Sequence, residues 1–284
     1  AALLYGSLAA HAFLGLRTLF FRRSLKMPAA EGVQTGFGLL IPVIAIGHIL
    51  GTAGVSGATG VDVTYAMKMA EFWLADGGPV GALQQIALVA ILWTHLCIGL
   101  SFAFQSRRWY RSARPLWLSA AILLPTLALL GFVDMGQEAA ARAAADPAWL
   151  ETQRAKMAVN GDGAFAWILR ERSWLAPAFV LSLVAAILLA RIIRHALSMR
   201  HGRVSIRYPE GVARRFDRGV SILEASRMTG VPHAAFCGGR GRCTTCRIRV
   251  DEGFEELPPP NEIEKRSLAR LGDPERVRLA CQTR

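Results

Sequence analysis

Charged residues are scarce in this chain, and cysteine is scarcer still. Only 19% of the 284 residues are Asp, Glu, Lys or Arg, against about 25% in a typical soluble protein, and 52% are hydrophobic. This composition excludes a disordered chain and a single uniform soluble domain. Five cysteines are too few for a disulfide-dense secreted fold. Acidic residues are the scarcer charge, 21 against 33 basic ones, which leaves a net charge of +12. In so apolar a chain this excess indicates the positive-inside bias of a membrane protein and no nucleic-acid partner.

Five apolar segments are each long enough to cross a membrane, which takes about 20 residues. They are too many to be the buried helices of one soluble domain. The first is unlike a signal peptide, because Arg22 and Arg23 follow it instead of preceding it. We therefore predict an all-α membrane bundle in residues 1–200, in contact with lipid. Its spans are expected at residues 1–21, 36–55, 83–104, 116–135 and 174–190.

The loops between these segments predict the orientation. Basic residues gather after the first, third and fifth segments, whereas the second loop is acidic, with Asp62, Glu71 and Asp76. By the positive-inside rule, the chain after residue 200 faces the cytoplasm, which predicts a multi-pass protein of the bacterial inner (plasma) membrane. Ala1 already lies inside an apolar segment. We therefore expect a longer protein with one more helix upstream.

Histidines inside membrane spans are costly, so each is a functional candidate. His11 lies 10 residues before the end of the first span and His95 lies 9 before the end of the third, which gives them nearly the same depth. His48 is expected slightly nearer the outer face, and His195 lies at the cytoplasmic end of the fifth span. These residues predict one or two haem b groups with axial imidazoles. Interhelical hydrogen bonds, or an interfacial position for His195, are the alternatives.

The composition changes at His201, after which a small α+β domain is predicted in residues 201–284. Alternating residues predict a hairpin of strands 204–208 and 212–216. Ser221 and Glu224 form a capping-box pattern that opens a helix ending at Gly230. A strand at 247–250, a second helix at 261–271 opened by Asn261, and a strand at 277–281 complete the prediction.

Four of the five cysteines lie in this domain. Their spacing is C-x5-C-x2-C, from Cys237 through Cys243 to Cys246, and 34 residues then separate Cys246 from Cys281. Three thiolates on a glycine-rich loop and a fourth on a distant strand indicate a 2Fe–2S cluster. Zinc sites more often use two short C-x2–4-C pairs, and disulfides do not suit a cytoplasmic domain. Cys97, in the third span, is expected to be an inert thiol.

The stretch VSILEASRMTGVPHAAFCGGRGRCTTCRIRV, with LPPP and VRLACQTR, resembles the β-grasp ferredoxin module of membrane-anchored bacterial class III adenylate cyclases. The resemblance implies that the four cysteines bind the cluster. It also implies a haem-binding anchor of six helices, and a C-terminal cyclase domain that makes cAMP from ATP and forms a homodimer. This chain contains no cyclase motif, so no catalytic residue is expected in it.

These observations predict a redox sensor. In it, quinol or another donor reduces the haem, the change reaches the cluster, and the activity of a cyclase is altered. An anchor subunit of a respiratory quinone oxidoreductase, resembling those of succinate dehydrogenases, is the alternative. A redox-gated transporter would need broken spans, for which Pro42 and Pro125 are the only candidates. Asp134 and Gln137 could contact a quinone, although helix-end roles suit them equally. The basic face of the domain suits anionic lipid or an acidic partner, through Arg240, Arg242, Arg247 and Arg249.

Overall fold

The computed structural model describes residues 2–159, 174–198, 202–209, 211 and 213–284. The chain forms two compact units, and both take up segments that are far apart in the sequence. The first unit contains the C-terminal domain together with parts of the helical region. Its segments are Ala1–Thr35, Ile98–Ala113 and Ala185–Arg284, and the second unit is made of Gly36–Cys97 and Arg114–Val184.

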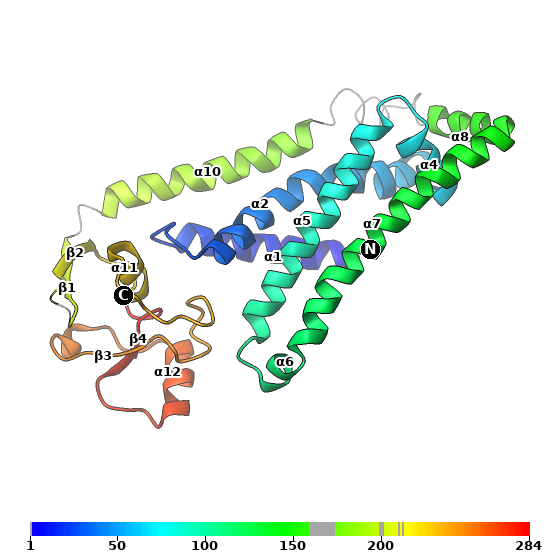
Figure 1. Cartoon of the computed structure of the whole chain (residues 1–284). Helices are drawn as coiled ribbons and strands as arrows, with labels where there is room; N and C mark the ends of the chain where they lie inside the picture. The colour runs from blue at the N-terminus through cyan, green and yellow to red at the C-terminus, as the bar shows by residue number, and fades with distance from the viewer. Residues whose placement is uncertain (1, 160–173, 199–201, 210, 212) are drawn as a thin grey trace. The chain divides into compact units, whose positions relative to one another are not determined.

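Five helices among the described residues are long and apolar enough to cross a membrane, and each coincides with a predicted span. No more than 6% of the apolar window of any of them is buried, so their large apolar side chains face outward, as lipid contact requires. Buried helices of a soluble core would show the reverse. Figure 1 labels them: α1 (Ala2–Phe21), α2 (Ala29–Ile49), α5 (Gly78–Phe104), α7 (Arg114–Ala145) and α10 (Leu175–Ser198).

The helices are longer than the apolar segments that predict them. Helix α2 begins at Ala29, before its apolar segment starts. Helix α7 continues to Ala145, because the polar stretch at its end is rich in alanine, which has a high helix propensity. Both helices also continue through Pro42 and Pro125, the two candidate breaks that the sequence offered. The broken spans that would favour a transporter are therefore not seen at these two positions.

Short helices occupy the segments that the sequence indicated only as loops. They are α3 (Val55–Thr59), α4 (Tyr65–Trp73), α6 (Arg108–Ser112) and α8 (Pro147–Val159). In the second unit, α4, α7 and α8 share a small buried core, and Gly136 lets the ring of Trp73 approach α7. The buried members of this core are Met69, Ala70, Met135, Ala139 and Trp149.

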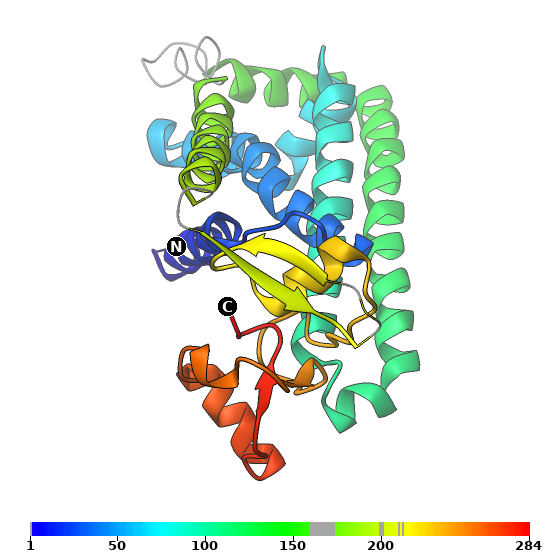
Figure 2. The ribbon, with the colours of Figure 1, turned by 90° about the vertical axis from the view of Figure 1, so that its left-hand side faces the viewer.

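Two hydrogen bonds hold α2, α5 and α7 together in the second unit. The Gln84 side chain donates to the carbonyl of Ile44 at 3.0 Å, which joins α5 to α2. The Trp93 indole donates to the carbonyl of Ala121 at 2.8 Å, which joins α5 to α7. Figures 1 and 2 show α5 and α7 side by side, as expected for consecutive helices joined by a short connection.

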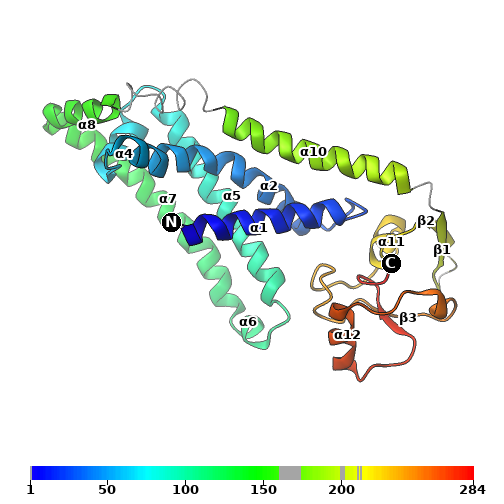
Figure 3. The same cartoon turned by 180° about the vertical axis from the view of Figure 1, so that it is seen from behind.

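The described part of the C-terminal domain contains short strands and the α-helices α11 and α12, and Figure 3 shows them from behind. Strands β1 (Arg203–Arg207) and β2 (Ala213–Asp217) form the predicted antiparallel hairpin. Strands β3 (Arg247–Arg249) and β4 (Val277–Leu279) form a second antiparallel pair. Helices α11 (Ile222–Thr229) and α12 (Glu262–Leu268) start at the predicted caps, and the capping box of α11 is complete.

The core of this domain includes two of the four cysteines expected to bind metal. Cys246 and Cys281 belong to one buried cluster, in which the packing of α11 and α12 against β4 surrounds the two thiols. The other buried members of the cluster are Leu223, Leu268, Leu279 and Ala280.

Candidate metal centre

All four C-terminal cysteines are free thiols and meet as two pairs. The Sγ atoms of Cys246 and Cys281 lie 3.2 Å apart, although 34 residues separate them in the chain. The backbone N–H of Cys237 donates to the Sγ of Cys243 at 3.3 Å. Cys243 is half-buried and the other three are buried. The loop after Phe236 and the end of β4 therefore place the four predicted ligands in two neighbouring pairs.

The loop between the first two cysteines needs glycine. Gly238, Gly239 and Gly241 have φ angles of 70°, 86° and 68°, a region that residues with a side chain rarely adopt. Gly241 has a second constraint, because a Cβ atom there would lie 2.6 Å from the Cγ2 of Ile263 in α12. The glycine pattern therefore reflects both the curl of the loop and its close packing on α12.

Replacing Gly241 with Ala is expected to destabilise the domain by about 1–3 kcal/mol, because strain in φ and overlap with Ile263 add together. Gly253→Ala is the matched control, since Gly253 has a φ of 74° and an added Cβ would meet no neighbouring atom within 4 Å. Chemical unfolding of both variants of the full chain measures the difference. Equal losses would contradict a steric role for Gly241.

Hydrogen bonds surround the sulfur of Cys243. The Thr245 hydroxyl lies 2.9 Å from this sulfur and accepts from the N–H of Phe236, and it can donate its proton to the sulfur when Cys243 is a thiolate. Burial opposes ionisation of Cys243, but the hydrogen bonds from Thr245 and Cys237 outweigh it and lower the pKa of the thiol. Cys243 is therefore suited to act as a thiolate ligand.

The second thiol pair shares one proton. The hydrogen bond from Cys246 lowers the pKa of Cys281 to about 6, and the Gln282 side chain adds a bond to the same sulfur at 3.4 Å. That shared hydrogen bond, together with burial, raises the pKa of Cys246. The hydrogen bond therefore favours the thiolate at Cys281 and the protonated thiol at Cys246, and metal binding would release the remaining proton.

A buried ion pair holds the strand that leads to Cys281. Glu264 in α12 is fully buried, and both of its oxygens accept from the guanidinium of Arg278 at 3.0 Å. The same carboxylate accepts from the N–H of Leu279 at 2.7 Å. Sequence reasoning missed this role, because it assigned the segment 261–264 only to a helix start. Glu264 thus fixes the end of β4, two residues before Cys281.

The donor set fits a two-iron cluster better than one metal ion. Within the described residues, no group of three or more His, Cys, Asp or Glu side chains is arranged to hold a single ion. A structural zinc ion needs four ligands around one point, whereas a 2Fe–2S cluster offers two irons to two thiolate pairs. The pairs Cys237–Cys243 and Cys246–Cys281 match the second requirement.

The cluster loop also contacts helix α5 within the first unit. The guanidinium of Arg240 lies 4.9 Å from the ring centre of Phe102, and its NH1 donates to the carbonyl of Cys237 at 3.2 Å. The Gln105 side chain donates to the carbonyl of Phe236. Arg240 therefore contacts the helical part of this unit, and all four arginines of the loop region, Arg240, Arg242, Arg247 and Arg249, are exposed.

The loop after α1 reaches the same domain through Glu224. Its carboxylate accepts from the backbone N–H groups of Arg23 and Ser24 at 2.9 and 3.2 Å, in addition to its predicted capping bond to Ser221. Burial opposes ionisation of Glu224, yet these hydrogen bonds outweigh it and lower the pKa of the carboxyl. The carboxylate of Glu31 forms two ion pairs, with Arg22 at 2.8 Å and with Arg227 at 3.3 Å. Two buried carboxylates therefore join this loop to α11.

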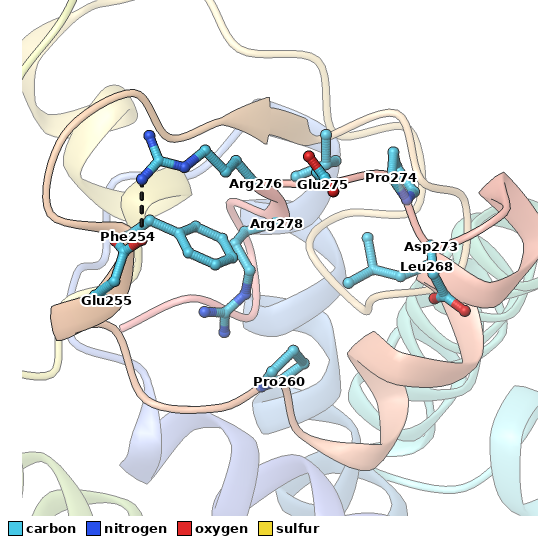
Figure 4. A pocket seen from close by; sticks show the side chains of 10 residues that line it. Phe254, Glu255, Pro260, Leu268, Asp273, Pro274, Glu275, Arg276 and Arg278 are labelled. Carbon is cyan, nitrogen blue, oxygen red and sulfur yellow. Dashed lines mark hydrogen bonds and ion pairs between the residues drawn. The ribbon is translucent and has the colours of Figure 1, made fainter.

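Figure 4 shows a cavity of about 450 Å³ in the C-terminal domain. Arg276 pairs with Glu255 at 2.9 Å on one side of it, and Arg278, which also lines it, is already bonded to Glu264. None of the four cysteines lines this cavity. It is therefore separate from the metal centre.

The predicted haem ligands are more dispersed than the cysteines. The ring of His95 lies against α2 at Gly38, where a Cβ atom would be 2.9 Å from its Cε1. His48 is ten residues, or about 15 Å of helix rise, further along α2, so these two imidazoles do not face each other across one iron. His11 is exposed on α1, and His195 on α10 lies 3.5 Å from Asp217 of β2. Haem ligation by these residues stays a prediction.

Comparison with known proteins identifies the C-terminal domain. The 2Fe-2S iron-sulfur cluster binding domain family matches residues 207–284. The 2Fe-2S ferredoxin-5 of Aquifex aeolicus is 37% identical over 65 residues, which cover 22% of this chain and 68% of that protein. The 2Fe-2S ferredoxin of Escherichia coli is 36% identical over 78 residues, 27% of this chain and 69% of the ferredoxin.

A component of a quinone enzyme is also similar. One subunit of the Na(+)-translocating NADH-quinone reductase of Chlamydia trachomatis is 26% identical over 104 residues, which are 37% of this chain but only 23% of that protein. No solved structure matches. Through residues 207–284 the chain therefore belongs to the family of 2Fe–2S iron–sulfur cluster binding domains, and it joins that domain to five apolar helices.

Proposed function

We propose that this chain is a membrane-anchored redox module in which Cys237, Cys243, Cys246 and Cys281 hold a 2Fe–2S cluster. The observation that carries the proposal is the meeting of these four thiols as two pairs, in a domain of the 2Fe–2S family joined to apolar helices. The anchor is residues 1–200, and residues 201–284 form a β-grasp domain that faces the cytoplasm of a bacterium.

A bound 2Fe–2S cluster takes up and releases one electron. The chain tunes this exchange through its own groups. Thr245 and the N–H of Cys237 place positive hydrogen-bond dipoles at the sulfur of Cys243, and Gln282 does so at Cys281. Such donors favour the more negative, reduced state and raise the reduction potential. Burial of three cysteines keeps water away from the metal site.

The contact between Arg240 and Phe102 supports a coupling of the cluster loop to the anchor. Phe102 belongs to α5, the helix that also contains His95 seven residues earlier. The amide of Gln105 adds a hydrogen bond at the same helix end.

We further propose that the anchor binds haem b, with His11, His48, His95 and His195 as the candidate ligands. By the resemblance drawn from the sequence, the module would regulate a C-terminal adenylate cyclase that works as a homodimer, with quinol as the donor. Of these candidates, His95 lies against Gly38, between α5 and α2.

A second candidate is an electron-transfer subunit of a quinone oxidoreductase. The similarity to the NADH-quinone reductase component favours it, since that protein is named as part of a quinone enzyme. The two candidates share the cluster and the anchor and differ in the partner. Formation of cAMP by the parent protein in oxidised and reduced states, against quinone reduction by its membranes, would separate them.

The test of the module itself uses the full chain purified without oxygen in detergent. We expect acid-labile sulfide in equal number to non-haem iron, a 2Fe–2S electron paramagnetic resonance signal after reduction with dithionite, and reduced haem b bands in the difference spectrum. Zinc without labile sulfide would contradict the assignment of a 2Fe–2S cluster. A cluster signal without haem bands would contradict only the proposal that the anchor binds haem.

A further inference from the structure

A second cavity, of about 600 Å³, lies in the second unit beside the C-terminal end of α2. Its volume is within the range of about 300–1,000 Å³ that is typical of small-molecule sites. It is formed by the turn that follows α2, by helix α3, by the connection 62–64 and by the start of α4, and none of the four C-terminal cysteines lines it. Six polar side chains line it: Thr52, Ser56, Asp62, Thr64, Tyr65 and Lys68.

The helix beside this cavity is irregular. Residues Leu50–Gly54 form a π-helical turn, a wide turn that is rare and often marks functional sites. Lys68 stabilises the turn by donating to the carbonyl of Gly51 at 2.9 Å. Thr52, in the same turn, donates to the carbonyl of His48 at 2.7 Å. The cavity is therefore one helical turn from a predicted haem ligand.

The cavity offers both donors and acceptors. The ammonium of Lys68 has three protons, of which two are used by Gly51 and by Glu71, whose carboxylate lies 2.7 Å away. The Tyr65 hydroxyl donates to Glu138 at 2.9 Å, and its oxygen can still accept. The carboxylate of Asp62 can accept from a ligand hydroxyl. A ligand with both kinds of group would find partners here.

The charge of the cavity selects against anionic ligands. Lys68 is the one cation among the described lining residues, and it is balanced by Glu71. Asp62 lines the cavity and Glu138 is bonded to Tyr65, so the surroundings carry a net negative charge. A lipid phosphate would be repelled, whereas a neutral head group would not.

The position of the cavity at the end of a candidate span restricts the class of ligand further. The cavity opens at the end of the candidate span Ala29–Gly57, where a molecule with an apolar tail in the bilayer can place its head group. We propose that the cavity binds the head group of a membrane quinone or quinol. A quinone presents carbonyl acceptors to Lys68, and a quinol presents hydroxyl donors to Asp62. The inference rests on the proposed redox function, and the residues that line the cavity do not include Asp134 or Gln137.

The test is equilibrium binding of ubiquinone-1 to the full chain in detergent, measured by calorimetry. Loss of a hydrogen bond to a charged group predicts that Lys68→Met weakens binding about ten-fold or more, and Lys68→Arg should restore part of it. Asp62→Asn leaves the contacts of Lys68 intact and is expected to weaken ubiquinol-1 more than ubiquinone-1. Lys156→Met, the same change at an exposed position of α8, should bind like the unchanged chain.

Dihexanoyl phosphatidylglycerol, a soluble anionic phospholipid, is the competing probe. Displacement of ubiquinone-1 by this lipid at comparable concentrations, or equal binding by Lys68→Met and Lys156→Met, would overturn the proposal. The 2Fe–2S signal of the same samples separates the two levels of inference. If the 2Fe–2S signal is present but ubiquinone-1 does not bind, only the proposed quinone site is wrong. If ubiquinone-1 binds but no 2Fe–2S signal is present, only the proposed redox function is wrong.

Discussion

Replacing Cys281 with Ser is expected to abolish the 2Fe–2S signal of the full chain. The Sγ of Cys281 is buried and lies 3.2 Å from that of Cys246. We expect these two thiols to bind the same iron, and Cys97, the one cysteine outside the four, cannot replace Cys281 there. The hydrogen bond from Cys246 already lowers the pKa of Cys281, which favours the thiolate form that binds iron. A serine hydroxyl has neither the acidity nor the softness of that ligand.

The control is Cys97→Ser, which changes the one cysteine outside the C-terminal domain. Iron, labile sulfide and the electron paramagnetic resonance signal should remain at the level of the unchanged chain. Cys243→Ser allows the loss of signal at a half-buried ligand, which lies near the Thr245 hydroxyl, to be compared with the loss at the buried Cys281. A full signal in Cys281→Ser, or its loss in Cys97→Ser, would contradict the assignment of the ligands.

The features that could be predicted from sequence are those set by neighbouring residues. Cysteine spacing and glycines predicted the loop, and the Ser221 and Asn261 caps both form because each helix start is decided within four residues. The apolar helices were also predictable, since length and hydropathy alone define them. Their ends were not, because alanine-rich polar sequence extends α7 beyond the apolar part.

Features that depend on distant residues could not be predicted. The burial of Glu264 follows from its pairing with Arg278, 14 residues later, and a Glu at a helix start gives no sign of that. The second bond of Glu224, to the chain near Arg23, spans about two hundred residues. Matching the depths of His11 and His95 likewise did not reveal that His95 packs on Gly38. Sequence defines local elements, whereas the partners of polar groups come from the tertiary fold.

The ion pair between Glu264 and Arg278 is expected to be the most sensitive structural feature of the cluster domain. Glu264→Ala leaves the buried guanidinium of Arg278 without its partner and removes the acceptor of the Leu279 N–H. Breaking one side of a buried pair costs about 3–5 kcal/mol, a large part of the stability of a small domain. Because β4 leads to Cys281, we expect the cluster to be lost in the same transition.

Denaturant unfolding of the full chain, followed by cluster absorbance, measures this loss. Glu262→Ala is the matched control, since its side chain is 75% exposed on the same helix and pairs with the exposed Lys265. The double variant Glu264→Leu with Arg278→Met should unfold at a higher denaturant concentration than Glu264→Ala, because no buried charge is left unpaired. If Glu264→Ala unfolds like Glu262→Ala, the carboxylate does not hold Cys281 in place, and the short hydrogen-bonded pair β3–β4 must do so alone.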